Sequence, residues 1–281
     1  MAAKGSFQRH LPLASAALFV LFVGPVSVDA SADLDRFELL GPVKTVVTKH
    51  PQLRTTHHFD RNGLLTSLEL SPTNGTDSAH YVFLHDATGR VIEEQTFEPN
   101  GTLIYKNIFR YGLDEQGRQT ALVAATDTGA FTHAEFEIYD NRGFLAEELY
   151  ISSHGAIEKS LFDVRGNLVY QARYYEGKLV QEVTHHYSPL GRLKESRHYG
   201  LDGDLMRRDL YRYNETGQRI EQHSEIFRQS HLRKSVVTFE FDHAGNWIKE
   251  TIQQWTDKNG SLALTETVVS RERILTYYGT E

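Results

Sequence analysis

The stretch Tyr139-Asp140-Asn141-Arg142-Gly143-Phe144-Leu145 decides the fold, because its pattern returns every 23 to 28 residues along most of the chain. Eight glycines mark the repeat, and Asp, Asn or Ser stands three positions before each of them. The pairs are Asp60 with Gly63, Asp86 with Gly89, Asp114 with Gly117, Asp140 with Gly143, Asp163 with Gly166, Ser188 with Gly191, Asn214 with Gly217, and Asp242 with Gly245. The first side chain of such a pair accepts a backbone hydrogen bond, and the glycine supplies the left-handed conformation that closes a type I turn with a bulge. The motif therefore predicts eight hairpin turns.

The segments between the turns read as strands. A second glycine follows the first in seven of the eight units, so that each unit contains two turns and two strands. Residues 103–111 show a period of two, with Leu103, Tyr105 and Phe109 on one face. We therefore expect an all-β fold, a meander of some sixteen antiparallel strands in one β-hairpin repeat domain that covers residues 43–278.

A sheet with so many strands cannot stay flat, because strands twist and large open sheets curl, split or close. We expect a curved open sheet or an incomplete barrel, in which the first and last units are caps. Trp247 and Trp255 are the only tryptophans and both fall in the final unit, where a large ring could close the end of the core.

The first thirty residues predict a secretory signal peptide. Lys4 and Arg9 precede an apolar run over 11–23 and a small-residue ending at Ala30. The competing interpretation is an uncleaved anchor, but the run is shorter than the roughly 20 residues of a spanning helix. Residues 31–42 read as a linker. We expect a secreted or periplasmic protein without a membrane span, and not a lipoprotein, because the chain has no cysteine.

The composition excludes several classes of function. The chain has 281 residues, of which 40% are hydrophobic and 24% charged, an ordinary globular composition. The net charge of −7 offers no basic footprint for nucleic acid. The absence of cysteine excludes disulfide scaffolds and Cys-ligated metal sites. Nucleophile-elbow, phosphate-loop and dinucleotide motifs are also missing, so the sequence predicts no cofactor.

The turn motif resembles the YD repeats of the Rhs type, whose units read approximately Tyr-Asp-x-x-Gly-Arg-Leu. The matching segments are residues 139–145, 162–168 and 241–247, with looser matches at 85–91 and 187–193. The resemblance implies a β-hairpin array, which in large family members forms a shell around a toxin. This chain is too short for such a shell and has no Asp-Pro dipeptide of the self-cleaving core. What remains of the resemblance is an expectation of surface interactions and carbohydrate binding.

Two sets of side chains invite a chemical interpretation. The pairs His57-His58 and His185-His186 could suggest a metal, but adjacent residues of a strand point to opposite faces and cannot chelate together. Four glutamates lie four residues after a turn glycine, at Glu93, Glu147, Glu195 and Glu221. In a stacked array they would form a row, either of catalytic carboxylates or of solvated charges balanced by Lys and Arg.

Tyrosine pairs are the candidate ligand contacts, because each places one ring on each face of a strand. They are Tyr174-Tyr175 and Tyr277-Tyr278. Exposed tyrosines suit sugar rings or protein partners. The leading hypothesis is a non-enzymatic, exported β-repeat protein that binds an envelope protein or glycan. The alternatives are a hydrolase of envelope polysaccharide that uses paired carboxylates, and a structural spacer.

Overall fold

The computed structural model describes residues 33–34, 37, 39–74, 78–228, 231–258 and 261–279, and the predicted signal peptide at 1–30 lies outside them. The described chain forms eighteen strands in one antiparallel sheet, in sequence order. The strands are β1 (Val43–His50), β2 (Leu53–Phe59), β3 (Leu65–Pro72), β4 (Ala79–His85), β5 (Val91–Phe97), β6 (Leu103–Leu113), β7 (Gln119–Thr126), β8 (Phe131–Tyr139), β9 (Leu145–Ser152), β10 (Ala156–Phe162), β11 (Leu168–Tyr175), β12 (Lys178–Tyr187), β13 (Leu193–Tyr199), β14 (Leu205–Tyr213), β15 (Arg219–Arg228), β16 (His231–Phe241), β17 (Trp247–Lys258) and β18 (Ser261–Tyr277). The prediction of an all-β meander is confirmed. The described residues contain no helix long and apolar enough to span a membrane.

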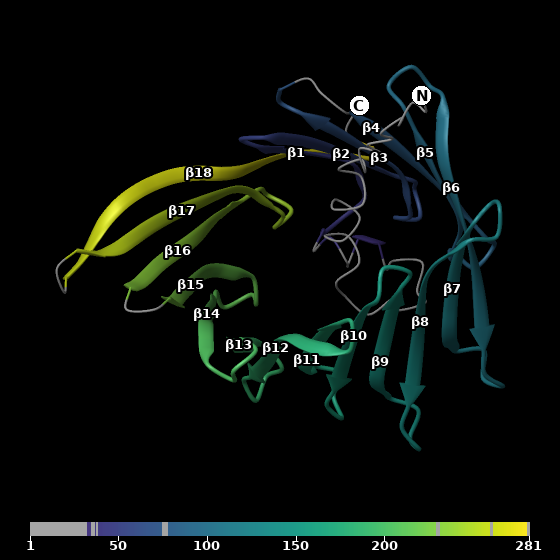
Figure 1. The fold of residues 1–281 in the computed structure, drawn as a ribbon. Coiled ribbons are helices and arrows are strands. Elements are labelled where there is room, and N and C mark those ends of the chain that lie inside the picture. Colours follow the sequence, from purple (N-terminus) through teal and green to yellow (C-terminus); the bar gives the residue numbers. More distant parts are fainter. Residues whose placement is uncertain are drawn as a thin grey trace, which may run out of the picture.

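The sheet is a closed barrel, because β1 pairs with β18 as well as with β2. Figure 1 shows the strands following one another around a ring until the yellow β18 lies beside β1. The expectation of an open sheet or incomplete barrel is therefore wrong, and the end units pair with each other instead of acting as caps. β18 makes this possible by its length, since its earlier residues pair with β17 and the segment 272–277 pairs with β1. Closure satisfies the backbone groups of both edge strands.

Two turns without glycine explain why the barrel has eighteen strands and not sixteen. One joins β1 to β2 at Pro51 and Gln52. The other lies between Arg228, where β15 ends, and His231, where β16 begins. Neither carries the glycine signal on which the sequence-based count depends.

Each of the eight Asx-Gly motifs forms the expected hairpin turn. The glycines have φ between 76° and 94°, a conformation that favours glycine over other residues. In every motif the Asp, Asn or Ser oxygen accepts a hydrogen bond from the backbone N–H four residues on, as from Arg90 to Asp86 at 3.1 Å. The six Asp residues also accept one from two residues on.

A bulge accompanies every one of these turns. The strand register shifts at the residue that precedes the Asp, Asn or Ser, from Phe59 in the first unit to Phe241 in the last. Bulges bend a strand and increase its right-handed twist. Eight bulges of the same kind along one rim supply the curvature that closes the sheet.

At several points along this rim, a side chain links one turn to the next. Arg192 Nη1 donates to the carbonyl oxygen of Asn214 at 3.3 Å, and Gln218 Nε2 donates to that of Gly245 at 2.8 Å. Both side chains directly follow a turn glycine. Asn246 holds the same position in the last unit but reaches Leu40, three residues before the first residue of β1, with bonds of 2.6 and 2.8 Å to its N–H and C=O. The side chain that elsewhere contacts the next turn thus joins the last of these turns to the segment before β1.

The segment that precedes β1 identifies the inner face of the wall. Leu39 is buried with Val46, Phe59 and Leu65, and Phe37 packs against this cluster. Figure 1 shows this purple segment inside the ring of strands. Directly paired residues share a face. His57 pairs with Val46 and Leu68 pairs with His57, so both also face inward, and the same rule assigns the inner face on the following strands. The sequence predicts only a linker for residues 31–42, whereas the described part of that segment fills the interior beside β1–β3.

Candidate functional site

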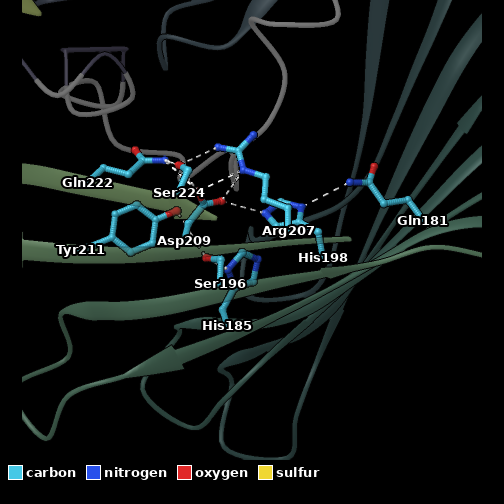
Figure 2. Close-up of polar contacts among 9 residues, drawn as sticks. All are labelled: Gln181, His185, Ser196, His198, Arg207, Asp209, Tyr211, Gln222 and Ser224. Carbon is cyan, nitrogen blue, oxygen red and sulfur yellow. Dashed lines mark hydrogen bonds and ion pairs between the residues drawn. The ribbon is translucent and has the colours of Figure 1, made fainter. Parts of the chain in front are cut away.

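A polar cluster occupies the inner wall on β12–β15, around Asp209 (Figure 2). The carboxylate of Asp209 accepts hydrogen bonds from His198 Nε2 at 3.1 Å and from Arg207 Nε at 3.0 Å. It also accepts one from the hydroxyl of Ser224 and one from the amide of Gln222, at 3.3 Å. Directly paired positions bring these groups together, since Ser196 pairs with Asp209 and Asp209 with Ser224. The cluster is a product of strand register.

A second group of contacts extends the cluster toward β12. His185 Nδ1 lies 2.9 Å from Ser196 Oγ, and the Tyr211 hydroxyl donates to the same oxygen at 3.4 Å. Gln181 Nε2 lies 3.3 Å from His198 Nδ1. These nine residues, all shown in Figure 2, form two adjacent hydrogen-bonded groups on the inner wall, one around Asp209 and one around Ser196.

The network contains serine, histidine and aspartate but not in a catalytic arrangement. Asp209 lies between Ser224 and His198, whereas nucleophilic catalysis requires the histidine between serine and carboxylate. Ser196 does contact a histidine, but only 1% of it is exposed. Burial opposes ionisation of Asp209, yet the hydrogen bonds from His198 and Ser224 and the charge of Arg207 lower its pKa to about 2. The cluster therefore fixes an ionised carboxylate inside the wall.

Two glutamates on the opposite part of the inner wall have raised pKa values. Glu94 accepts a hydrogen bond from Asn107 Nδ2 at 3.2 Å, and burial raises its pKa. Glu137 accepts one from Gln119 Nε2 at 2.9 Å, and burial raises its pKa as well. Only 2% of Glu94 and 8% of Glu137 are exposed. Both are thus set into a packed wall and are not presented to a dissolved substrate.

The predicted row of glutamates lies on the outer face, and each member is paired with a cation on a neighbouring strand. Lys106 Nζ lies 2.8 Å from Glu93, Lys159 Nζ lies 3.0 Å from Glu147, and Arg208 Nε lies 2.7 Å from Glu195. Arg212 pairs with Glu221. The glutamates therefore form a row of solvated charges balanced by Lys and Arg, which is the second of the two interpretations.

The histidine pairs divide between the two faces, as expected for neighbours in a strand. His57 is buried inside, with its ring centroid 4.8 Å from that of Phe37, while His58 Nε2 lies 3.9 Å from Glu69 outside. His185 contacts Ser196 on the inner face, and His186 lies opposite Glu195 on the outer face of β12 and β13. Within the described ranges, no three His, Asp or Glu side chains are placed to hold a metal ion.

The four candidate tyrosines have different roles. The Tyr277 hydroxyl accepts from Asn246 Nδ2 at 2.8 Å and donates to Asp242, and the Tyr278 hydroxyl donates to the carbonyl oxygen of Phe59 at 2.6 Å. These two therefore join the end of β18 to the β16–β17 turn and to β2. Tyr175 is 49% exposed at a hairpin end.

Tyr174 belongs to an apolar patch on the outer face of β7–β11, which sequence reasoning did not find. The patch consists of Val123, Phe136, Ile138, Leu149, Ile151, Ile157, Leu161, Tyr170 and Tyr174. Ile138 is 52% exposed, Val123 39% and Phe136 37%. The alternation of each strand was visible in the sequence, but the register that aligns five strands was not. We refer to these nine residues as the outer patch.

Ion pairs cover the outer face on the strands β13–β17. On β13–β15, Arg208 pairs with Glu195 and lies 3.9 Å from Glu225, and Arg197 Nε lies 2.8 Å from Glu195. Lys249 and Glu240 pair at 2.7 Å on β16 and β17. One ion pair, Lys159 with Glu147, lies among the residues of the outer patch. The outer patch thus contrasts with the charged outer face of β13–β17.

Comparison with protein-family models finds no match, and no curated protein matches in sequence. Among solved structures, the chain is similar to a porin-like protein from Bacteroides uniformis, with 10% identity and a TM-score of 0.45 over 84% of this chain and 98% of that one. It is also similar to TcdB2-TccC3, with 14% identity and a TM-score of 0.29 over 78% of this chain and 16% of that one. These scores do not establish a shared function.

Proposed function

We propose that this chain is an exported, non-enzymatic protein that binds a protein partner through the outer patch of a closed β-barrel. The observation that carries the proposal is a contrast on the outer wall: nine apolar side chains gather on β7–β11, whereas on β13 and β14 the outer charges form ion pairs. Contiguous apolar surface on an otherwise charged protein marks an interaction site.

The charged outer wall supports an aqueous environment around the barrel. The ion pair of Arg208 with Glu195 and that of Lys106 with Glu93 lie on the outer face within strands. A lipid-facing wall would have to bury such charges at a cost of about 2–4 kcal/mol for each Lys or Arg at mid-bilayer. We place the protein outside the cytoplasm on the predicted signal peptide.

The chemistry of the outer patch favours a protein over a glycan. Leu149, Ile151 and Ile157 offer no hydrogen-bond donors or acceptors in their side chains, and glycan sites need several. Tyr170 and Tyr174 supply aromatic area at one side, as at many protein interfaces. The turn motif supports the further proposal that the barrel is built from degenerate YD repeats.

The hydrolase alternative finds less support in the inner wall. Glu94 and Glu137 have raised pKa values, as a general acid requires, but burial within hydrogen-bonded pairs is the cause. A non-enzymatic role is therefore the better proposal.

A pull-down from envelope extract tests the proposal. The chain from residue 33 onward is used as bait, beside Ile138→Lys and the matched control Leu264→Lys. Leu264 is 54% exposed and Ile138 52%, so the two changes add the same charge at equal exposure. We expect wild type and the control to retain the same protein and Ile138→Lys to lose it. Equal retention of the partner by all three baits would show that the outer patch does not bind it. Shortened glycan among the products would show that the protein is an enzyme.

A further inference from the structure

The inner wall carries a row of side chains at one level of β13–β17. Strand register sets the row: His198 pairs with Arg207, Arg207 with Ile226, and Ile226 with Arg233. Arg233 in turn pairs with Thr256 on β17. Directly paired residues share a face, and Arg207 belongs to the polar cluster of the inner wall. All five side chains therefore face the interior of the barrel.

Solvent reaches this row from the inside. Arg233 is exposed and the side chain of Arg207 is 42% exposed, although both belong to the inner face. Gln181, which contacts His198 Nδ1 in Figure 2, is exposed as well. The row also lies close to one end of the barrel, since Arg233 comes two residues after the start of β16 at His231. A dissolved molecule can therefore meet these side chains at that end.

The row has an excess of positive charge at Arg233. Arg207 Nε donates to Asp209, which offsets its charge, whereas Arg233 forms no ion pair within the described ranges. Another inward carboxylate, Glu266, lies two strands from β16 and pairs in register with Gln254. The two arginines together thus present one positive charge that the described side chains do not balance.

The curvature of the wall brings Arg207 and Arg233 together. They lie two strands apart, about 9.6 Å at the backbone, with Ile226 between them. On the concave face of a closed sheet, side chains from neighbouring strands converge, so the two guanidinium groups can meet above Ile226. Arg207 keeps Nη1 for a ligand, because its Nε and Nη2 donate to Asp209 and Ser224. Planar guanidinium groups match the geometry of a carboxylate.

We infer that Arg207 and Arg233 form a binding site for a small organic carboxylate on the inner wall. The single excess charge favours a singly charged carboxylate over phosphate, which carries close to two charges at pH 7. Ile226 offers apolar contact to the carbon chain of the ligand, and Thr256 adds a hydroxyl beside Arg233. The site lies on the opposite face of the wall from the outer patch and goes beyond the proposed function.

Isothermal titration calorimetry with hexanoate at pH 7 tests the inference on the chain from residue 33 onward. We expect saturable binding of one hexanoate to wild type. Arg233→Gln should weaken it by about tenfold or more, because hydrogen bonds to a charged group are lost. The matched control is Arg110→Gln. Arg110 is also exposed and without an ion pair within the described ranges, but it faces outward beside Val123, so this variant should bind as wild type does.

A second variant places the ligand group in the chain itself. Ile226→Glu puts a carboxylate between the two arginines, so it should abolish hexanoate binding while circular dichroism shows the same all-β spectrum as wild type. Hexylammonium, with the opposite charge on the same carbon chain, should not bind. Equal affinity of wild type and Arg233→Gln, tighter binding of inorganic phosphate than of hexanoate, or no saturable binding up to about 10 mM would each overturn the inference.

Discussion

Asn246 offers a direct test of how the barrel is held closed. Its side chain is 1% exposed and makes three hydrogen bonds: Oδ1 accepts from Leu40 N–H at 2.6 Å, while Nδ2 donates to the Leu40 carbonyl and to the Tyr277 hydroxyl, both at 2.8 Å. Asn246→Ala removes all three. At about 1 kcal/mol net for each bond, the free energy of unfolding should fall by about 3 kcal/mol.

The repeat provides a matched control at Asn167. This residue follows Gly166 as Asn246 follows Gly245, but its amide donates only to Asp163 within its own turn, at 2.9 Å. Asn167→Ala should therefore cost about 1 kcal/mol. Urea unfolding, followed by circular dichroism and by tryptophan fluorescence, measures both. Equal losses for the two variants would refute the idea that Asn246 closes the ring of turn contacts.

Three further predictions concern protonation and backbone conformation. Asp209 has its pKa lowered to about 2, so its stabilisation is present above pH 3.8 and is lost as pH falls through about 2. In an acid titration of stability over that window, Asp209→Asn should therefore lose about 2 kcal/mol less than wild type. Burial, and then the charge of Arg273, lowers the pKa of His57 to about 4, so His57 should contribute about 3 kcal/mol to the fall in stability between pH 6.5 and 4, and His57→Gln should reduce that fall by this amount. Gly245→Ala should destabilise by more than the about 1 kcal/mol expected of Gly155→Ala in thermal unfolding. Both glycines have positive φ, but the added Cβ at Gly245 lies 2.6 Å from Gln218 Nε2 and 3.1 Å from Leu40, while that at Gly155 meets open space; equal losses would contradict the close approach of these two side chains.

Local rules were enough to predict the turns and the strands. The Asx-Gly pair specifies a bulged hairpin by hydrogen bonds within five residues, as Asp86 and Gly89 show. Strand alternation likewise placed His57 and His58 on opposite faces. The turns without glycine, such as that at Pro51, were not predicted, because they lack the Asx-Gly pair.

The candidate site depended on contacts that local rules do not reach. Ile138, Leu161 and Tyr170 come from three strands, and only their register brings them onto one face of the wall. Tyr277 was predicted as a ligand contact, whereas the structure uses its hydroxyl to hold Asp242 and Asn246 near the end of the last strand. A pattern within one strand cannot distinguish a ring that faces solvent from one that faces another strand.

By itself, the sequence determined that the chain is an all-β meander of repeated hairpins, because each turn is specified by its own side chain and glycine. Only the tertiary structure decided that the meander closes, since closure depends on the summed bend of eight bulges and on β1 meeting β18 more than 220 residues along the chain. It also decided which face is inner and which charges are paired. Curvature accumulates over the whole sheet, and no single repeat contains the information that the last strand will reach the first.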